Sequence, residues 1–202
     1  MLKFKIMLIA LVALVYYGVT YCMLSRSTCQ YYADYYLFDA RSFSIKQELA
    51  FKQTPIKKIT DFFHVYRFNV NERNLRVIGF ARYEENGLWT DGNTSKLSFL
   101  LSSTSSDVLL YFNIDPYVNA RNPEIYTEVY LEDRQIAKWD FIYGKKMPKT
   151  IIKLAKKEIP SDRLINLTFK IEGMNSPQKL GYGDDTRKLG LSFNSIEVRP
   201  KN

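Results

Sequence analysis

The chain is poor in the side chains that most often perform catalysis or hold metals. Its 202 residues include one histidine and two cysteines. Catalytic triads need a histidine beside the nucleophile, and zinc sites need several Cys, His or acidic ligands. The one histidine, His64, lies in the apolar run FFHVYRF, which is typical of a core or edge strand. The sequence therefore argues against triad chemistry and against a zinc site.

Long uncharged runs are also missing, with one exception near the N-terminus. Ile6–Leu24 holds 19 residues without a charge, after two lysines and before one arginine. As a helix it would be about 28 Å long, which matches the hydrocarbon core of a bilayer. We expect residues 1–25 to be a transmembrane signal anchor with its N-terminus in the cytoplasm. A cleaved signal peptide is the alternative, although its apolar region is usually shorter.

Acidic residues are outnumbered, 21 against 29 Lys and Arg, which gives a net charge of +8. Such a charge favours anionic neighbours, which include nucleic acid, anionic lipid and acidic glycan. Six lysines gather between positions 145 and 157, and no acidic residue interrupts them before Glu158: Lys145, Lys146, Lys149, Lys153, Lys156 and Lys157. We expect these lysines to form a solvated face, with a polyanion-facing patch as the alternative.

What the chain has in abundance is aromatic residues, 15% of the total. Residues 26–40 form a tyrosine-rich stalk, and residues 41–202 show short alternating runs separated by turn residues. The predicted strands are Phe43–Phe51, Phe62–Val70, Leu75–Tyr83, Lys96–Ser102, Val108–Ile114, Ile125–Leu131, Gln135–Tyr143, Thr150–Ala155, Leu164–Ile171 and Leu189–Val198. Strands about 10 residues apart, without long helical patterns between them, predict an all-β, antiparallel sandwich or jelly roll. Thr150–Ile159 also fits one face of a helix.

The last predicted strand has the clearest inward face. Leu189, Leu191 and Phe193 alternate with small or polar residues, and Ile196 and Val198 continue the apolar face one position out of step. One extra residue in a strand shifts the alternation in this way. The pattern predicts an inner strand with a bulge at Asn194-Ser195.

Two stretches carry a resemblance to a known family. The first has a Gly-Phe strand, a Glu and a Gly-x-Trp-Thr-Asp-Gly motif: Gly79, Phe80, Glu85, Gly87, Trp89, Thr90, Asp91 and Gly92. The second has Ser-Pro, a glycine-rich turn, Asp-x-Arg and Leu-Gly: Ser176, Pro177, Gly181, Asp185, Arg187, Leu189 and Gly190. Together they resemble a β-sandwich domain of unknown function at the C-termini of bacterial envelope glycosyltransferases and phosphoglycerol transferases. The resemblance implies a fold like that of carbohydrate-binding jelly rolls. The sequence departs from the family in that the expected anchor, and no transferase domain, accompanies the sandwich.

The first stretch supplies three candidate ligand-binding residues. Trp89 could stack on a sugar face while Glu85 and Asp91 accept hydroxyl hydrogen bonds. Aromatic residues also fill cores, so we expect both Trp89 and Trp139 to be core residues. A glycosidase needs two carboxylates at a defined separation, and the sequence does not fix the separation of Glu85 and Asp91.

The second stretch supplies three more candidates, Asp184, Asp185 and Arg187. Its Gly-x-Gly follows a Ser-Pro turn and leads into a strand, whereas a dinucleotide loop follows a strand and opens a helix. We expect a structural clasp in which Arg187 pairs with Asp185 or Asp184. The alternative is a sugar-hydroxyl or Ca²⁺ site on the two aspartates, since Ca²⁺ prefers oxygen ligands. No other cofactor is expected.

The combined prediction is a single-pass protein of the bacterial inner membrane with its β-sandwich in the periplasm or outside the cell. It would be a non-catalytic glycan-binding or accessory module in envelope polysaccharide or lipid-linked sugar metabolism. The expected partners are the membrane, an envelope glycan and an integral-membrane glycosyltransferase, with no nucleic acid. The alternatives are a carboxylate-dependent enzyme that modifies envelope sugars and a structural subunit that docks onto a membrane glycosyltransferase.

Overall fold

The computed structural model describes residues 56, 58–59, 62–69, 75–102 and 106–201. They belong to the second of two compact units of the chain, which begins at Phe51. The predicted anchor, the stalk and the first predicted strand lie outside the described residues. Among the residues described, no helix is long and apolar enough to cross a membrane.

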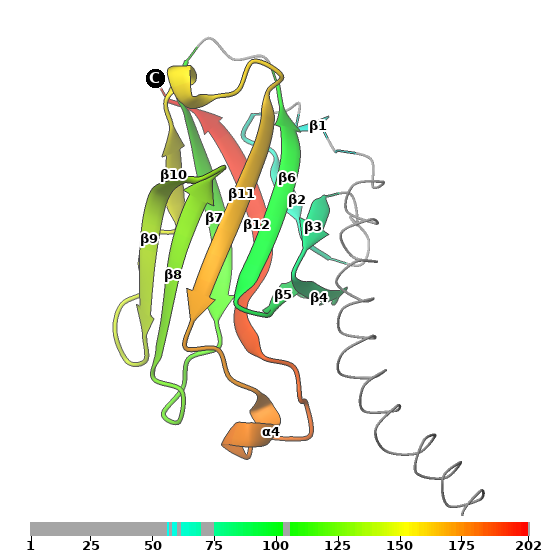
Figure 1. Ribbon diagram of the computed structural model, residues 1–202, viewed down its shortest axis with the longest axis vertical. Coiled ribbons are helices and arrows are strands. Elements are labelled where there is room, and N and C mark those ends of the chain that lie inside the picture. Colours follow the sequence, from blue (N-terminus) through cyan, green and yellow to red (C-terminus); the bar gives the residue numbers. More distant parts are fainter. Residues whose placement is uncertain (1–55, 57, 60–61, 70–74, 103–105, 202) are drawn as a thin grey trace, which may run out of the picture. The chain divides into compact units, whose positions relative to one another are not determined.

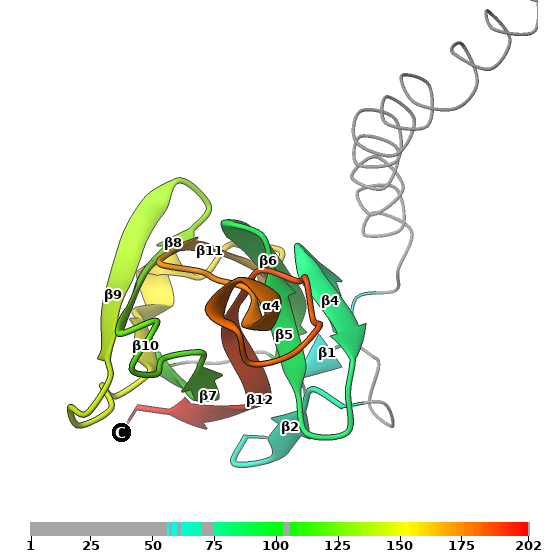
Figure 2. The same ribbon diagram turned by 90° about the horizontal axis from the view of Figure 1, so that it is seen from below.

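The described residues form two six-stranded sheets that pack face to face (Figures 1 and 2). Sheet A consists, in spatial order, of β1 (Lys58–Ile59), β6 (Thr94–Leu101), β11 (Leu164–Glu172), β8 (Glu124–Leu131) and β9 (Arg134–Ile142), with β3 (Arg76–Ile78) also paired to β6. Sheet B consists of β10 (Ile151–Leu154), β7 (Val108–Pro116), β12 (Leu189–Pro200), β5 (Leu88–Asp91) and β4 (Phe80–Tyr83), with β2 (Val65–Arg67) also paired to β12. The described strands pair antiparallel except β1 with β6, which is parallel. The predicted all-β class is confirmed for this part of the chain.

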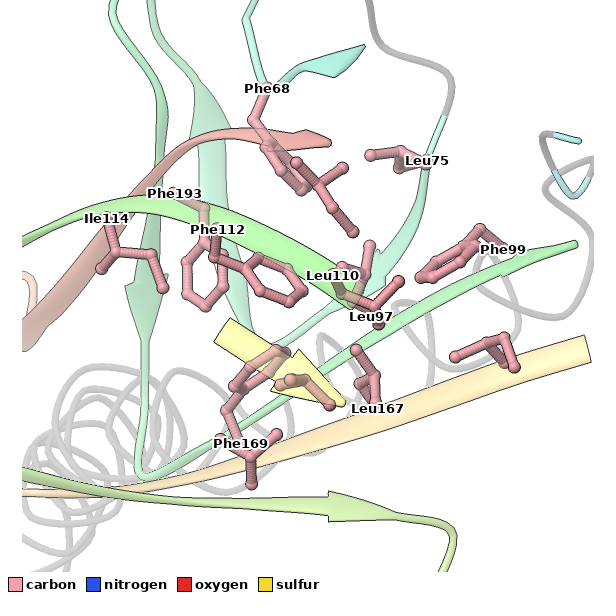
Figure 3. Packing of buried hydrophobic residues seen from close by; sticks show 14 of the residues in the cluster. Phe68, Leu75, Leu97, Phe99, Leu110, Phe112, Ile114, Leu167, Phe169 and Phe193 are labelled. Carbon is pink, nitrogen blue, oxygen red and sulfur yellow. The ribbon is translucent and has the colours of Figure 1, made fainter. Parts of the chain in front are cut away.

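Aromatic rings from both sheets meet at the centre of the core (Figure 3). Phe169 on β11 lies edge-on to Phe193 on β12, with ring centroids 4.9 Å apart. Phe112 on β7 contacts both rings at 5.9 Å. Such edge-to-face pairs contribute about 0.5–1.5 kcal/mol each beyond their buried area. Trp139 is 3% exposed and joins this cluster, which confirms its expected place in the core.

Strand β12 contains the predicted bulge. Phe193 lies opposite Ile114 of β7, whereas Ser195 lies opposite the very next residue, Asn113, so Asn194 is the extra residue. The inward face shifts there, and Phe193 and Ile196 are both fully buried. Residues before the bulge pair with β5 on the other side, and residues after it pair with β2.

The prediction of one strand over Leu75–Tyr83 is wrong. It breaks at Gly79 into β3, which belongs to sheet A, and β4, which belongs to sheet B. Gly79 has a φ of +76°, and a Cβ there would lie 2.2 Å from the carbonyl oxygen of Thr94. Only glycine tolerates both conditions, so this residue permits the chain to change sheets.

Three shorter elements also differ from expectation. Strands β1 and β5 were not predicted because runs of two and four residues are too short to show alternation. The ambiguous stretch Thr150–Ile159 contains β10 followed by a 3₁₀-helix, η2 (Lys156–Glu158). The side chain of Glu158 accepts a hydrogen bond from the backbone N–H of Ala155 at 2.8 Å, which holds this turn against β10.

We predict that Phe193→Ala lowers the free energy of unfolding by about 3–5 kcal/mol, because it removes a fully buried ring at the contact of the two sheets. Phe63→Ala is the control, since Phe63 is 63% exposed, and it should change stability by less than about 0.5 kcal/mol. Urea unfolding of the two variants and the parent measures both effects. Equal losses for the two variants would contradict the packing described here.

Candidate functional site

The outer face of sheet B contains a hollow that is lined, among the described residues, by polar residues. Its volume is about 410 Å³, and its lining residues come from β2, the β4–β5 turn, β7 and β12: Arg67, Asn69, Glu85, Asn86, Asn113, Asp115, Asn194 and Ser195. We call this hollow the polar cavity. Four of the lining residues are asparagines, each of which offers both hydrogen-bond donors and an acceptor.

The bulge in β12 builds the floor of the polar cavity. A bulged residue bends the strand and redirects its side chain, and here Asn194 Nδ2 donates to Asp115 Oδ2 at 2.7 Å. The backbone carbonyl of Asn194 accepts a hydrogen bond from the N–H of Phe68 at 2.9 Å. The cavity therefore lies where the edge partner of β12 changes from β5 to β2.

The β4–β5 hairpin forms one wall. Its turn closes with a hydrogen bond from the N–H of Glu84 to the carbonyl of Gly87 at 2.9 Å, which leaves Glu85 and Asn86 at the tip. Gly87 has a φ of +155°, and a Cβ there would lie 2.6 Å from Asn194 Oδ1. Glycine thus lets the hairpin approach the bulge closely enough to enclose the cavity.

The structure separates the three candidates of the first motif. Glu85 lines the polar cavity, and Asp91 does not. Residues alternate along β5, with Leu88 and Thr90 buried and with Asp91 exposed. Trp89 shares the outer face with Asp91 and is half-buried, edge-on to Tyr117 at 6.1 Å between ring centroids. The expectation of Trp89 in the core is therefore wrong, because its place in the alternation directs it outward.

The predicted Asp185–Arg187 ion pair is present. Arg187 Nη2 donates to Asp185 Oδ2 at 2.6 Å, and Arg187 Nε lies 3.1 and 3.0 Å from the two carboxylate oxygens. Arg187 Nη1 also donates to Glu84 Oε1 at 2.7 Å. The hydrogen bonds to Asp185 are the largest cause that raises the pKa of Arg187 above its ordinary value. The hydrogen bond to Glu84 adds to this effect, and burial opposes it. The second partner, Glu84, was not expected.

The clasp, defined as Glu84, Asp185 and Arg187, connects the two sequence motifs across 103 residues of chain. Glu84 begins the turn whose tip carries Glu85 and Asn86, so the clasp holds the β4–β5 hairpin that forms one wall of the polar cavity. The loop that carries Asp185 and Arg187 is anchored by helix α4 (Pro177–Leu180), whose N-cap is Ser176. The N–H of Gln178 donates to the carbonyl of Asp185 at 2.9 Å, which ties the loop to the helix.

The structure gives the two aspartates different surroundings. Asp184 is exposed, whereas both carboxylate oxygens of Asp185 accept hydrogen bonds from Arg187. Within the described ranges, no group of three or more His, Cys, Asp or Glu could hold a metal ion.

The lysine-rich run does not form one patch. Lys145, Lys146 and Lys149 precede β10, and Lys156 and Lys157 follow it, so the two groups lie at opposite ends of that strand. Lys153 lies between them with its Nζ 3.6 Å from Asp107 Oδ2. His64, expected in the core or on an edge strand, is exposed directly before strand β2.

Sequence reasoning missed seven of the eight described residues that line the polar cavity. Most of them occupy outward-facing positions on strands, where polar residues are ordinary. The one available signal was the bulge at Asn194-Ser195, because bulges often occur beside functional sites. The cross-strand register that brings Arg67 and Asn113 to the same bulge could not be read from spacing.

Comparison with known proteins gives no family assignment. No family model matches the sequence, and no curated protein matches it significantly. Solved structures with partial similarity include a CBM36-1 domain of a multidomain xylanase from the hindgut metagenome of Trinervitermes trinervoides. It has 8% identity and a TM-score of 0.37, with 69% of this chain and 98% of that chain covered.

Two further solved structures show the range of these similarities. One is CBM51 from Clostridium perfringens GH95 in complex with methyl-galactose, with 16% identity, a TM-score of 0.33, and coverage of 68% of this chain and 90% of that one. The other is the Cry4Aa toxin from Bacillus thuringiensis, with 12% identity, a TM-score of 0.32, and coverage of 57% and 19%. What this domain binds has to be inferred from its own side chains.

We predict that Arg187→Ala lowers the free energy of unfolding by clearly more than about 1 kcal/mol, the limit for an exposed ion pair. The side chain is 30% exposed and has two carboxylate partners, so its loss leaves two acidic groups close together. Asp184→Asn, which changes an exposed neighbour of the clasp, should leave stability nearly unchanged. Thermal and urea unfolding compare the two, and equal small effects would exclude a structural role for the clasp.

Proposed function

We propose that this domain is a non-catalytic glycan-binding module and that the polar cavity is its binding site. The observation that carries the proposal is the lining of the cavity, because each of its eight described residues carries an amide, carboxylate, guanidinium or hydroxyl group. Most small-molecule sites are lined chiefly by apolar side chains with a few polar groups. A cavity in which every described lining residue carries a polar group instead suits a ligand rich in hydroxyl groups, each of which both donates and accepts.

The arrangement of charges supports a sugar ligand. Asp115 and Glu85 supply charged acceptors, Arg67 supplies donors, and the asparagines supply both. Asn194 holds one oxygen of Asp115 at 2.7 Å, which fixes the orientation of that carboxylate before a ligand arrives. Fixed groups lose less conformational entropy on binding, so this part of the site is preorganised.

Trp89 supplies an aromatic surface on the same face. It lies opposite Ser192 of β12, which in turn lies opposite Asp115 of β7. Two strand spacings separate Trp89 from Asp115, roughly 9–10 Å. A sugar unit held next to the polar cavity could therefore contact the indole while its neighbour binds Asp115.

The setting of the module is also a proposal. The uncharged segment Ile6–Leu24 supports a single-pass anchor in the bacterial inner membrane with the sandwich outside the cytoplasm. The resemblance to the C-terminal domain of envelope glycosyltransferases supports a role in envelope polysaccharide or lipid-linked sugar metabolism, beside an integral-membrane glycosyltransferase.

We predict that Asp115→Ala weakens the binding of an envelope glycan by about 10- to 100-fold, the value of one or two hydrogen bonds to a charged group. The matched control is Asp140→Ala, because Asp140 is an exposed aspartate on β9 of the other sheet. A fragment of residues 26–202 is screened against envelope glycans, and affinities are measured by calorimetry. Equal affinities for the two variants would place the site elsewhere. Glycan turnover that Glu85→Gln abolishes would replace this proposal by the carboxylate-dependent enzyme.

The proposed topology predicts that protease added to spheroplasts digests the sandwich while an N-terminal fragment stays in the membrane fraction. The physical reason is that a 19-residue uncharged segment is long enough to remain in the bilayer. Immunoblotting with antibodies to residues 1–25 and to the C-terminus follows both parts, and spheroplasts opened with detergent are the control. A sandwich protected in intact spheroplasts, or a soluble mature chain that begins near Arg26, would refute the anchor.

A further inference from the structure

The loop between β9 and β10, residues 143–149, exposes apolar and basic side chains together. Its sequence is Tyr-Gly-Lys-Lys-Met-Pro-Lys, and it projects from the edge of the sandwich (Figures 1 and 2). Tyr143 is 55% exposed and Met147 is 44% exposed, which places both among the most exposed large apolar side chains of the described residues. Exposed apolar groups of this kind mark contact surfaces when they are clustered.

The lysines of this loop are free of acidic partners. Lys145, Lys146 and Lys149 are exposed, and within the described part of the chain none of them forms an ion pair. The acidic residues on the adjoining strands are already engaged. Asp140 of β9 pairs with Lys138 at 3.9 Å, and Glu124, which lies opposite Ile142, accepts the hydroxyl of Tyr126.

The backbone of the loop is held in place from its first residues. The N–H of Tyr143 donates to the carbonyl of Pro123 at 2.8 Å, and the N–H of Lys145 donates to the carbonyl of Ile142 at 3.0 Å. Pro148 fixes its own φ near the far end. Little further ordering of the loop backbone is therefore needed on binding.

We propose that the β9–β10 loop docks onto the headgroup region of an anionic lipid bilayer. The three lysines would contact lipid phosphates, while Tyr143 and Met147 would enter the boundary between headgroups and acyl chains. A soluble polyanion would satisfy the lysines but would give the two apolar side chains nothing to contact. A bilayer offers both chemistries at once, and tyrosine is enriched at membrane interfaces.

This docking is independent of the polar cavity and of the N-terminal anchor. The test uses the full chain in phosphatidylcholine nanodiscs, with Cys22→Ser and Cys29→Ser, and with Met147→Cys bearing an environment-sensitive dye. Vesicles that contain phosphatidylglycerol are titrated in, and the emission shift and its quenching by a lipid-soluble quencher are recorded. The matched control carries the same dye through Ser161→Cys, an exposed position beyond β10 in the η2–β11 loop.

We expect a blue shift at position 147 with phosphatidylglycerol vesicles and none with phosphatidylcholine vesicles or at position 161. Replacing the three lysines by glutamine should raise the lipid concentration for half-maximal shift on the order of 100-fold, because each lysine near an anionic surface contributes about a factor of five. Tyr143→Ser should reduce the quenching. An equal response to both lipids, or in the glutamine variant, would overturn the proposal, and so would an equal shift with dextran sulfate in place of vesicles.

Discussion

The pairing of β12 is the constraint on which the rest of the sandwich depends. This strand lies between β7 on one side and both β5 and β2 on the other, so it determines the positions of three neighbouring strands at once. The extra residue at Asn194 lies where the partner on that edge changes from β5 to β2, and the same residue lines the polar cavity.

The irregular features of sheet B lie close together around that strand. Gly87 permits the hairpin to approach Asn194, and the hydroxyl of Thr90 accepts a hydrogen bond from the N–H of Leu191 at 2.9 Å, where the pairing with β5 shifts register. The clasp then holds the hairpin through Glu84. The register shifts of β12 interrupt regular pairing in this part of sheet B, and the polar cavity lies beside them. Stability and the geometry of the site are therefore provided by the same contacts.

Sequence patterns were sufficient for the longer strands and for the bulge, since alternation over eight or more residues has a definite inner face. They failed where a single residue decides the outcome. Gly79 interrupts a run that reads as one strand, and a short element such as β5 offers too few positions to tell which way Trp89 points. The Arg187–Asp185 pair could be predicted because its members are two residues apart. Glu84, as a third member, depends on a contact across the whole domain, and so does nearly all of the polar cavity.

The crossing at Gly79 has a consequence for how the sandwich opens. The chain leaves sheet A at Gly79 and returns to it between Asp91 and Thr94, and the two crossings are joined because the carbonyl of Gly79 accepts from the N–H of Asp91 at 2.9 Å and from the hydroxyl of Ser95 at 2.7 Å. These two hydrogen bonds hold the two sheets together at this edge. The opposite edge, at β9 and β10, is bridged by a longer connection, and the buried hydroxyl of Thr127 on the neighbouring strand β8 has no hydrogen-bond partner among the described residues. Slow breathing motions should therefore part the sheets from the β9–β10 side, so that water enters the core there first and amide hydrogens exchange from that edge inward.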